Sequence, residues 1–198
     1  MATYKLPDLQ TGQSSSSSII LYGGGNGPTN GLNGIAVGWQ VSTIVYETSD
    51  PRLFTFWTID DKSNTGCVDF QCAGFDYKTG NWWVTCNNEI SLGYFPKELL
   101  PKMEDNALLV QLGGFVNSPL NVPSPPMGSG HPSNEGFNKA AYFIEVQFVD
   151  EHDNLFDPYP PDLHPRADIS DYYSVADNHY ANDKDKYVFA YGGAGGFK

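Results

Sequence analysis

The sequence predicts an all-β fold, an antiparallel β-sandwich with at most short helical turns. Three observations predict it. The 198 residues include 12 Phe, 12 Tyr and 4 Trp, and aromatic residues are enriched in strands. The 21 Gly and 14 Pro divide the chain into short segments, as many strands joined by turns require. No long segment keeps a helical spacing of apolar residues.

The chain is long enough to bury a core without the support of disulfides. We expect one sandwich domain at residues 19–198, since no linker or repeat divides the sequence. Residues 1–18 are predicted to form a flexible segment ahead of it. This segment ends in five serines, Ser14 to Ser18, which have no apolar face to bury.

Apolar alternation between turn residues predicts the strands. In the first half they lie at 19–22, 35–46, 52–59, 82–86 and 90–95. The glycine-rich stretch 23–28 is interpreted as a loop, because it lacks the ending of a phosphate-binding loop. One helical turn is expected at 96–100, where a proline stands first. Later strands are expected at 107–115, 140–149 and 187–191, and a proline-rich loop at 117–132.

Charge excludes several partners. The net charge is -12, from 23 acidic and 11 basic residues, so nucleic acid and anionic membranes would repel the protein. No apolar run is long enough for a transmembrane segment. There is no signal peptide in this chain, which predicts a cytoplasmic protein, or an extracellular one if a precursor was trimmed. The sequence predicts no oligomeric state.

The cysteines and aspartates do not predict a metal or a cofactor. Cys67 and Cys72 are spaced to close a small disulfide turn, and Cys86 is expected to be a buried apolar side chain. No cysteine–histidine spacing indicates zinc. Many aspartates lie beyond residue 149, but their spacing is not that of an EF-hand, so we interpret them as solvated loops.

Several motifs occur in an order that resembles the neprosin domain of plants, from about residue 19 to 193. They are Gly38-Trp39-Gln40-Val41, Arg52-Leu53-Phe54-Thr55-Phe56-Trp57-Thr58, Thr65-Gly66-Cys67 with Cys72-Ala73-Gly74-Phe75, Gly80-Asn81-Trp82-Trp83 with Gly93-Tyr94-Phe95-Pro96, and Met127-Gly128-Ser129-Gly130-His131 with Glu135-Gly136. The resemblance implies a β-sandwich whose groove binds an extended, proline-containing peptide.

The resemblance also implies a pair of catalytic glutamates, one ionised to accept a proton from water and one protonated to donate it. At the two corresponding positions this chain has Ala36 and Phe115. Neither side chain can hold a proton, so the sequence predicts that the chain is not an active peptidase.

Strand alternation predicts what remains in the groove. Ala36, Gly38 and Gln40 would share one face of their strand, and Gln111 and Phe115 one face of theirs. Gln40 and Gln111 offer amides, which do not titrate. The groove-lining candidates are Gln40, Gln111, Trp39, His131 and Glu145. Glu145 and Glu135 are also weighed as substitutes for the two missing acids.

The chain departs from the family at three further places. After Gly74-Phe75 it omits a stretch that relatives have. Tyr172 stands where a cysteine is expected, and the terminal cysteine that would pair with it is absent before Lys198.

Three functions stay open at this point. The first is a catalytically inactive ligand-binding or plant-defence protein, insecticidal or antimicrobial. The second is an acid-active prolyl endopeptidase that uses substitute carboxylates. The third is a lectin-like glycan binder, for which the sequence offers four stacking residues: Trp39, Trp57, Trp82 and Trp83.

Overall fold

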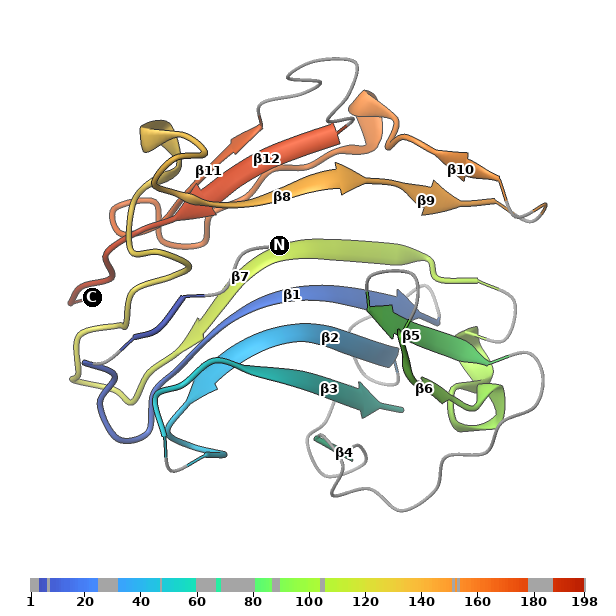
Figure 1. Cartoon of the computed structure of the whole chain (residues 1–198), viewed down its shortest axis with the longest axis horizontal. Helices are drawn as coiled ribbons and strands as arrows, with labels where there is room; N and C mark the ends of the chain where they lie inside the picture. The colour runs from blue at the N-terminus through green and yellow to red at the C-terminus, as the bar shows by residue number, and fades with distance from the viewer. Residues whose placement is uncertain are drawn as a thin grey trace. The chain divides into compact units, whose positions relative to one another are not determined.

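A computed structural model gives the fold (Figure 1). It describes residues 4–6, 8–24, 32–46, 48–59, 67–68, 81–86, 90–103, 106–150, 152, 154–177 and 187–197. Strands dominate these residues, and the helical elements among them are 3₁₀ turns of three residues each. The all-β prediction is confirmed. Among the described residues there is no helix long and apolar enough to span a membrane.

The largest sheet has five strands in the order β4-β3-β2-β1-β7. Its strands are β1 (Ser14–Gly23), β2 (Asn33–Ser42), β3 (Arg52–Thr58), β4 (Cys67–Val68) and β7 (Leu109–Asn117).

Contacts divide the chain into two compact units, which we describe separately. Unit 1 holds Met1–Ser17, Trp39–Arg52 and Gly113–Lys198, and unit 2 holds Ser18–Gly38 and Leu53–Leu112. The expectation of a single domain stays a prediction.

Unit 2 is held by an apolar core. Ile35, Phe95, Leu100 and Met103 are buried together, and Trp82 packs against them. The indole Nε1 of Trp82 also donates a hydrogen bond to the carbonyl oxygen of Met103 at 3.0 Å, so this ring closes the core without leaving a polar atom unsatisfied.

A hairpin and two short turns supply most of this core. The hairpin pairs β5 (Trp82–Cys86) with β6 (Ile90–Phe95), both at their expected positions. The turns are η2 (Lys97–Leu99) and η3 (Pro101–Met103). η2 confirms the single helical turn predicted at 96–100. Pro101 follows it and prevents a longer helix.

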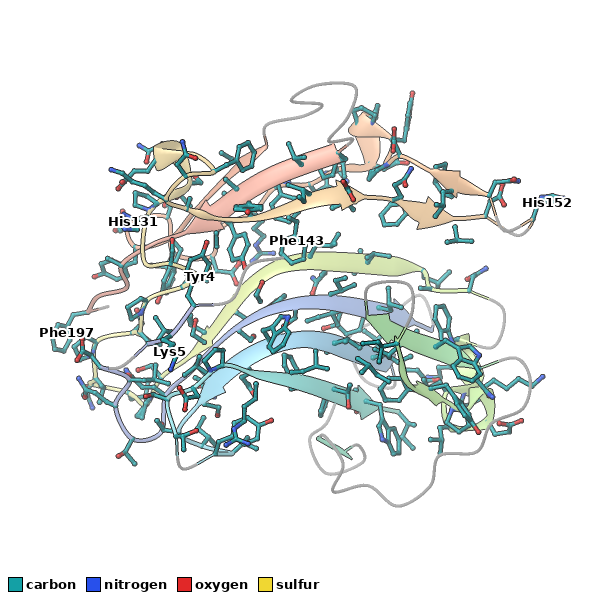
Figure 2. All side chains as sticks on the ribbon, viewed as in Figure 1. Tyr4, Lys5, His131, Phe143, His152 and Phe197 are labelled. Carbon is teal, nitrogen blue, oxygen red and sulfur yellow. The ribbon has the colours of Figure 1, made fainter. Side chains whose placement is uncertain are left out.

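Unit 1 contains a three-stranded sheet in the order β11-β12-β8. These strands are β11 (Ser174–Asp177), β12 (Tyr187–Gly192) and β8 (Ala141–Val146), and all their pairings are antiparallel. Every residue of the central strand β12 is buried. Phe143 of β8 stacks on Phe189 of β12 with ring centroids 5.0 Å apart, which places an aromatic layer at the centre of the unit (Figure 2).

The other elements of unit 1 are short. A two-stranded sheet pairs β9 (Phe148–Val149) with β10 (Leu155–Phe156). Two 3₁₀ turns complete the described part of the unit, η4 (Ser133–Glu135) and η5 (Pro160–Asp162).

The prediction that the serine run lies ahead of the first strand is wrong, because β1 begins at Ser14. Four of its five serines are buried. The hydroxyl of Ser17 makes a short hydrogen bond to the hydroxyl of Tyr191 in β12. A serine side chain can occupy an interior when a partner satisfies its hydroxyl, and hydrophobic patterning does not detect such positions.

Gln13, immediately before β1, forms hydrogen bonds with several loops. Its side chain is buried, and its Nε2 donates to the Ser118 hydroxyl at 3.0 Å and to the Pro123 carbonyl oxygen at 2.7 Å. Its backbone N–H donates to the Thr43 hydroxyl, and its Oε1 accepts from the Gln10 N–H. Through its side chain and its backbone, Gln13 thus links its own segment to Thr43 and to the 118–123 segment, which are distant in the sequence.

Other expected boundaries shift for local reasons. β2 ends at Ser42 rather than residue 46, because the Ser42 hydroxyl accepts hydrogen bonds from the N–H groups of Ile44 and Val45 and closes a turn. The strand expected at 140–149 is divided into β8 and β9. β4, β10 and β11 were not predicted, since two- to four-residue strands carry almost no periodic signal.

Candidate functional site

Ala36 lies in β2, within unit 2, and is buried. Its neighbours Ile35 and Val37 pack into the core with Phe95. Because side chains alternate along a strand, Ala36 points to the opposite face of β2. A methyl group at this buried position offers neither a proton nor a hydrogen bond.

Phe115 lies in β7, within unit 1, and its side chain is 38% exposed. The neighbouring Gly114 faces the interior, since a Cβ there would meet Met127 and the Tyr191 ring at 2.5–2.6 Å. Phe115 therefore points away from β12. On the same face, a Cβ at Gly113 would meet none of the described residues within 4 Å, so they leave this side of β7 open.

A family model described as Neprosin matches residues 11–75 and 76–194. The chain belongs to the neprosin family. The two matched segments meet between Phe75 and Asp76, which is the junction where the sequence analysis finds an omitted stretch. These two residues lie outside the described part of the structure.

The two glutamine candidates of this neprosin-family chain have different surroundings. Gln40 of β2 lies in unit 1 and is half-buried, and its Oε1 is buried with no hydrogen-bond partner in the described part of the chain. Gln111 of β7 is exposed and lies in unit 2. A buried acceptor without a partner is uncommon, which makes the Gln40 amide available to an N–H donor of a ligand or to water.

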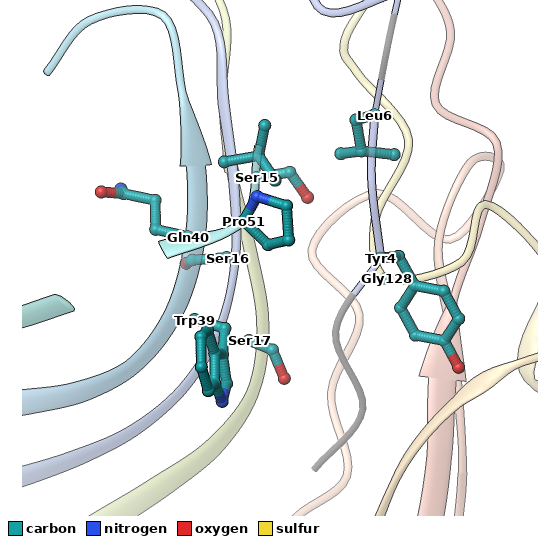
Figure 3. Close-up of a pocket in the computed structure, with 10 residues that line it drawn as sticks. Tyr4, Leu6, Ser15, Ser16, Ser17, Trp39, Gln40, Pro51 and Gly128 are labelled. Carbon is teal, nitrogen blue, oxygen red and sulfur yellow. The ribbon is translucent and has the colours of Figure 1, made fainter. Parts of the chain in front are cut away.

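Trp39 lines a small cavity in unit 1, together with Gln40 (Figure 3). Tyr4 and Leu6 of the N-terminal segment lie opposite Ser15 and Ser17 of β1. The cavity volume is about 20 Å³, which holds about one water molecule rather than a peptide. Sequence reasoning missed this arrangement, because the N-terminal segment carries no strand pattern.

The buried hydroxyl pair beside this cavity was also missed. Burial, more than any other cause, raises the pKa of Tyr191 to about 12, whereas the hydrogen bond between its hydroxyl and that of Ser17 opposes the rise. Burial likewise raises the pKa of Tyr4. These phenols stay protonated at the acidic pH at which a glutamic peptidase would work, so they act as hydrogen-bonding groups and not as bases.

His131 lies on the surface of unit 1 (Figure 2). Glu135 and Lys139, both exposed, lie beside it. Glu135 Oε2 is 3.0 Å from Lys139 Nζ and 3.2 Å from His131 Nδ1. The hydrogen bond from Lys139, and after it the one from His131, lowers the pKa of the Glu135 carboxyl. A general acid needs the opposite shift, so Glu135 is poorly suited to replace a protonated catalytic glutamate.

Glu145 is exposed on β8 at a break in the strand pairing. Between the pairs Tyr187–Val146 and Phe189–Phe143, β8 contains one more residue than β12, and Glu145 has φ +55. This β-bulge interrupts the alternation of side chains along β8, so Ile144 and Glu145 are both exposed although they are adjacent. The Glu145 side chain is therefore open to solvent rather than enclosed in a site.

The proposed Cys67–Cys72 disulfide and the environment of Cys86 lie outside what the structure describes. In the described part of the chain, no three His, Cys, Asp or Glu residues gather as a metal site would require. Tyr172 stands where the resemblance implies a cysteine. Its ring packs against Gly196, since a Cβ on that glycine would lie 2.7 Å from the ring.

Proposed function

We propose that this neprosin-family protein binds extended peptides, including proline-containing ones, without cleaving them. One observation carries the proposal: Ala36 and Phe115 occupy the positions at which the family resemblance implies catalytic glutamates. The two substitute acids weighed from the sequence do not restore the chemistry. Glu135 is held ionised by Lys139, and Glu145 is solvated on a bulge.

Retained polar groups favour binding. Gln40 keeps an unpartnered buried Oε1, and an amide oxygen of this kind accepts a hydrogen bond from a peptide N–H. We call the face of β7 that carries Gly113 and Phe115 its outer face. The open space at Gly113 and the exposed ring of Phe115 make this face apolar and sterically accessible. An apolar surface with few oriented polar groups is what peptide and ligand sites commonly use.

The test measures binding and cleavage on the same sample. A fluorescein-labelled, proline-containing peptide is titrated with protein between pH 4 and 7, and fluorescence anisotropy reports binding. Mass spectrometry then reports the integrity of the peptide. We expect saturable binding of an intact peptide. Cleavage, or no binding by any peptide of a varied panel, would overturn the proposal.

Matched variants locate the binding face. Gly113→Trp fills open space on the outer face of β7, and we expect it to weaken binding by at least tenfold. Ile144→Trp places the same ring at a 43% exposed position of β8 and should leave binding unchanged. Equal effects of the two variants would contradict the assignment to β7.

Glycan binding is the second candidate, and one observation favours it. Of the four tryptophans, Trp83 alone is exposed, at 47%, and its ring lies 4.9 Å from that of Tyr94. An exposed indole face is suited to stacking on a sugar. Quenching of tryptophan fluorescence by cell-wall oligosaccharides, abolished in Trp83→Ala, would support this candidate. A role in defence, insecticidal or antimicrobial, stays a prediction.

A further inference from the structure

β7 is an edge strand without the usual protection. It ends the five-stranded sheet and is nine residues long, and among the strands that the structure describes it pairs with β1 alone. None of the nine is buried, and none is charged or a proline. The uncharged region extends from Asn106 to Gly130, in a chain whose net charge is -12.

Natural sheets protect long edges with charges, prolines, bulges or short length, because unpaired N–H and C=O groups recruit other strands. The other edges that the structure describes have such features. β4 has two residues, and β11 has four and ends in Asp177. β8 carries Glu145 and a bulge. β5 and β6 are uncharged, but they have five and six residues and their pairing is interrupted.

The side chains of β7 add an apolar component to this edge. Leu109 is 52% exposed and Phe115 is 38% exposed, and Leu108, just before the strand, is 69% exposed. At the middle of the strand, a Cβ on Gly113 would meet none of the described residues within 4 Å, so no side chain covers this face of β7 there. An incoming strand would therefore find both main-chain hydrogen-bonding groups and apolar surface.

We propose that β7 binds an extended peptide of a partner protein by strand addition, through main-chain hydrogen bonds along its free edge. The inference rests on the proposed peptide binding and specifies its mode. The partner is an apolar, uncharged segment with basic flanks. A second copy of this chain is disfavoured, because each copy carries a charge of -12 and the two would repel each other.

Strand addition has a chemical signature that side-chain recognition lacks. Only alternate N–H groups of the bound peptide face β7, so N-methylation has an effect at every second position. The probe is a lysine-flanked peptide of alternating threonine and valine, about ten residues long. We expect N-methyl groups in one alternate set to weaken binding more than tenfold, and those in the other set to have little effect.

Amide hydrogen exchange identifies the strand that binds. On adding the probe, we expect slower exchange at alternate residues of β7 and no change in β11, an edge strand of the three-stranded sheet. Protection of residues 35–40 in β2 without β7 would overturn strand addition and leave the proposed peptide binding intact. No binding of this probe or of the proline peptides would overturn both. Concentration-dependent self-association through β7 would also overturn the inference.

Two proline variants give an independent check. At adjacent positions of an edge strand, one N–H points to the neighbouring strand and the other points outward, where proline is tolerated. Of Leu112→Pro and Gly113→Pro, we expect one to unfold more readily and the other to keep its stability but bind the probe at least tenfold more weakly. Full binding by the stable variant would contradict strand addition.

Discussion

β12 and β7 are two strands of one protein with opposite burial. All six residues of β12 are buried, and its aromatic side chains stack on those of β8. None of the nine residues of β7 is buried. The two strands pack closely at Gly114, because the absence of a side chain there leaves room for the Tyr191 ring of β12.

The difference separates the residues that hold the fold from the positions that are free to change. Substitutions in β12 would disturb a close-packed interior, whereas the outer face of β7 can exchange side chains at little cost in stability. Phe115 lies on that outer face. A neprosin fold can therefore persist after the position implied to carry a catalytic glutamate has become an aromatic ring.

The largest expected contrast is between two glycines. Gly192 in β12 has φ +146, and a Cβ there would collide with the carbonyl oxygen of His131. We expect Gly192→Ala to lower the free energy of unfolding by about 3 kcal/mol or more, because the backbone must shift. Gly113→Ala in β7 meets open space and should be neutral or stabilising by about 0.5 kcal/mol. Urea denaturation measures both, and similar losses would contradict the comparison.

The second prediction concerns the pH dependence of β12. The pKa of Tyr191 is about 12 in the folded chain and 10.0 for an ordinary tyrosine. Because the folded value is raised, the stabilisation is complete below pH 10 and is lost as pH rises toward 12, by roughly 2–3 kcal/mol. Tyr191→Phe removes this loss, so the difference between the two unfolding curves isolates Tyr191. Parallel curves from pH 9 to 12 would contradict the burial of this hydroxyl.

The third prediction compares two glutamines. Gln13→Ala removes a buried amide with hydrogen bonds to Ser118, Pro123 and Gln10, and we expect a loss of about 2 kcal/mol. Gln111→Ala in β7 removes an exposed amide and should cost less than about 0.5 kcal/mol. Chemical denaturation at pH 7 measures both. A larger loss at Gln111 would show that β7 is more tightly packed than its exposure indicates.

The smallest effect is expected beside β12, at the bulge of β8. Glu145 has φ +55, a conformation that is unfavourable for any residue with a Cβ. Glu145→Gly should raise the free energy of unfolding by about 0.5–1 kcal/mol. The neighbouring Ile144→Gly, at an ordinary φ, should lower it by a similar amount. A loss in both variants would mean that the Glu145 side chain stabilises the fold through a contact.

The sequence predicted strands best where turn residues bracket an apolar run. β5 and β6 begin and end as expected, and β12 extends one residue further than expected. Prediction failed at Ser14–Ser18, where interior hydroxyls replace apolar side chains. It failed again at Glu145, because a bulge depends on the partner strand and leaves no local pattern. β11 pairs with a strand ten residues further along the chain, beyond the reach of local periodicity.

The candidate site divides in the same way. Ala36 and Phe115 were identified from the order of motifs alone, because the resemblance implies glutamates at these two positions and the sequence shows which residues stand there. The Gln40 oxygen without a partner and the ion pair of Glu135 with Lys139 depend on three-dimensional neighbours. The free edge of β7 depends on the order of strands in the sheet, which no single segment encodes.

The most direct test of the central claim is cleavage of proline-containing fluorogenic peptides between pH 2.5 and 7. The natural chain is assayed beside Ala36→Glu/Phe115→Glu, with the circular dichroism of both recorded as a control for folding. We predict no turnover by the natural chain at any pH, and turnover at acidic pH by the folded double variant. Turnover by the natural chain that survives repurification and is lost in Glu135→Gln or Glu145→Gln would contradict the account.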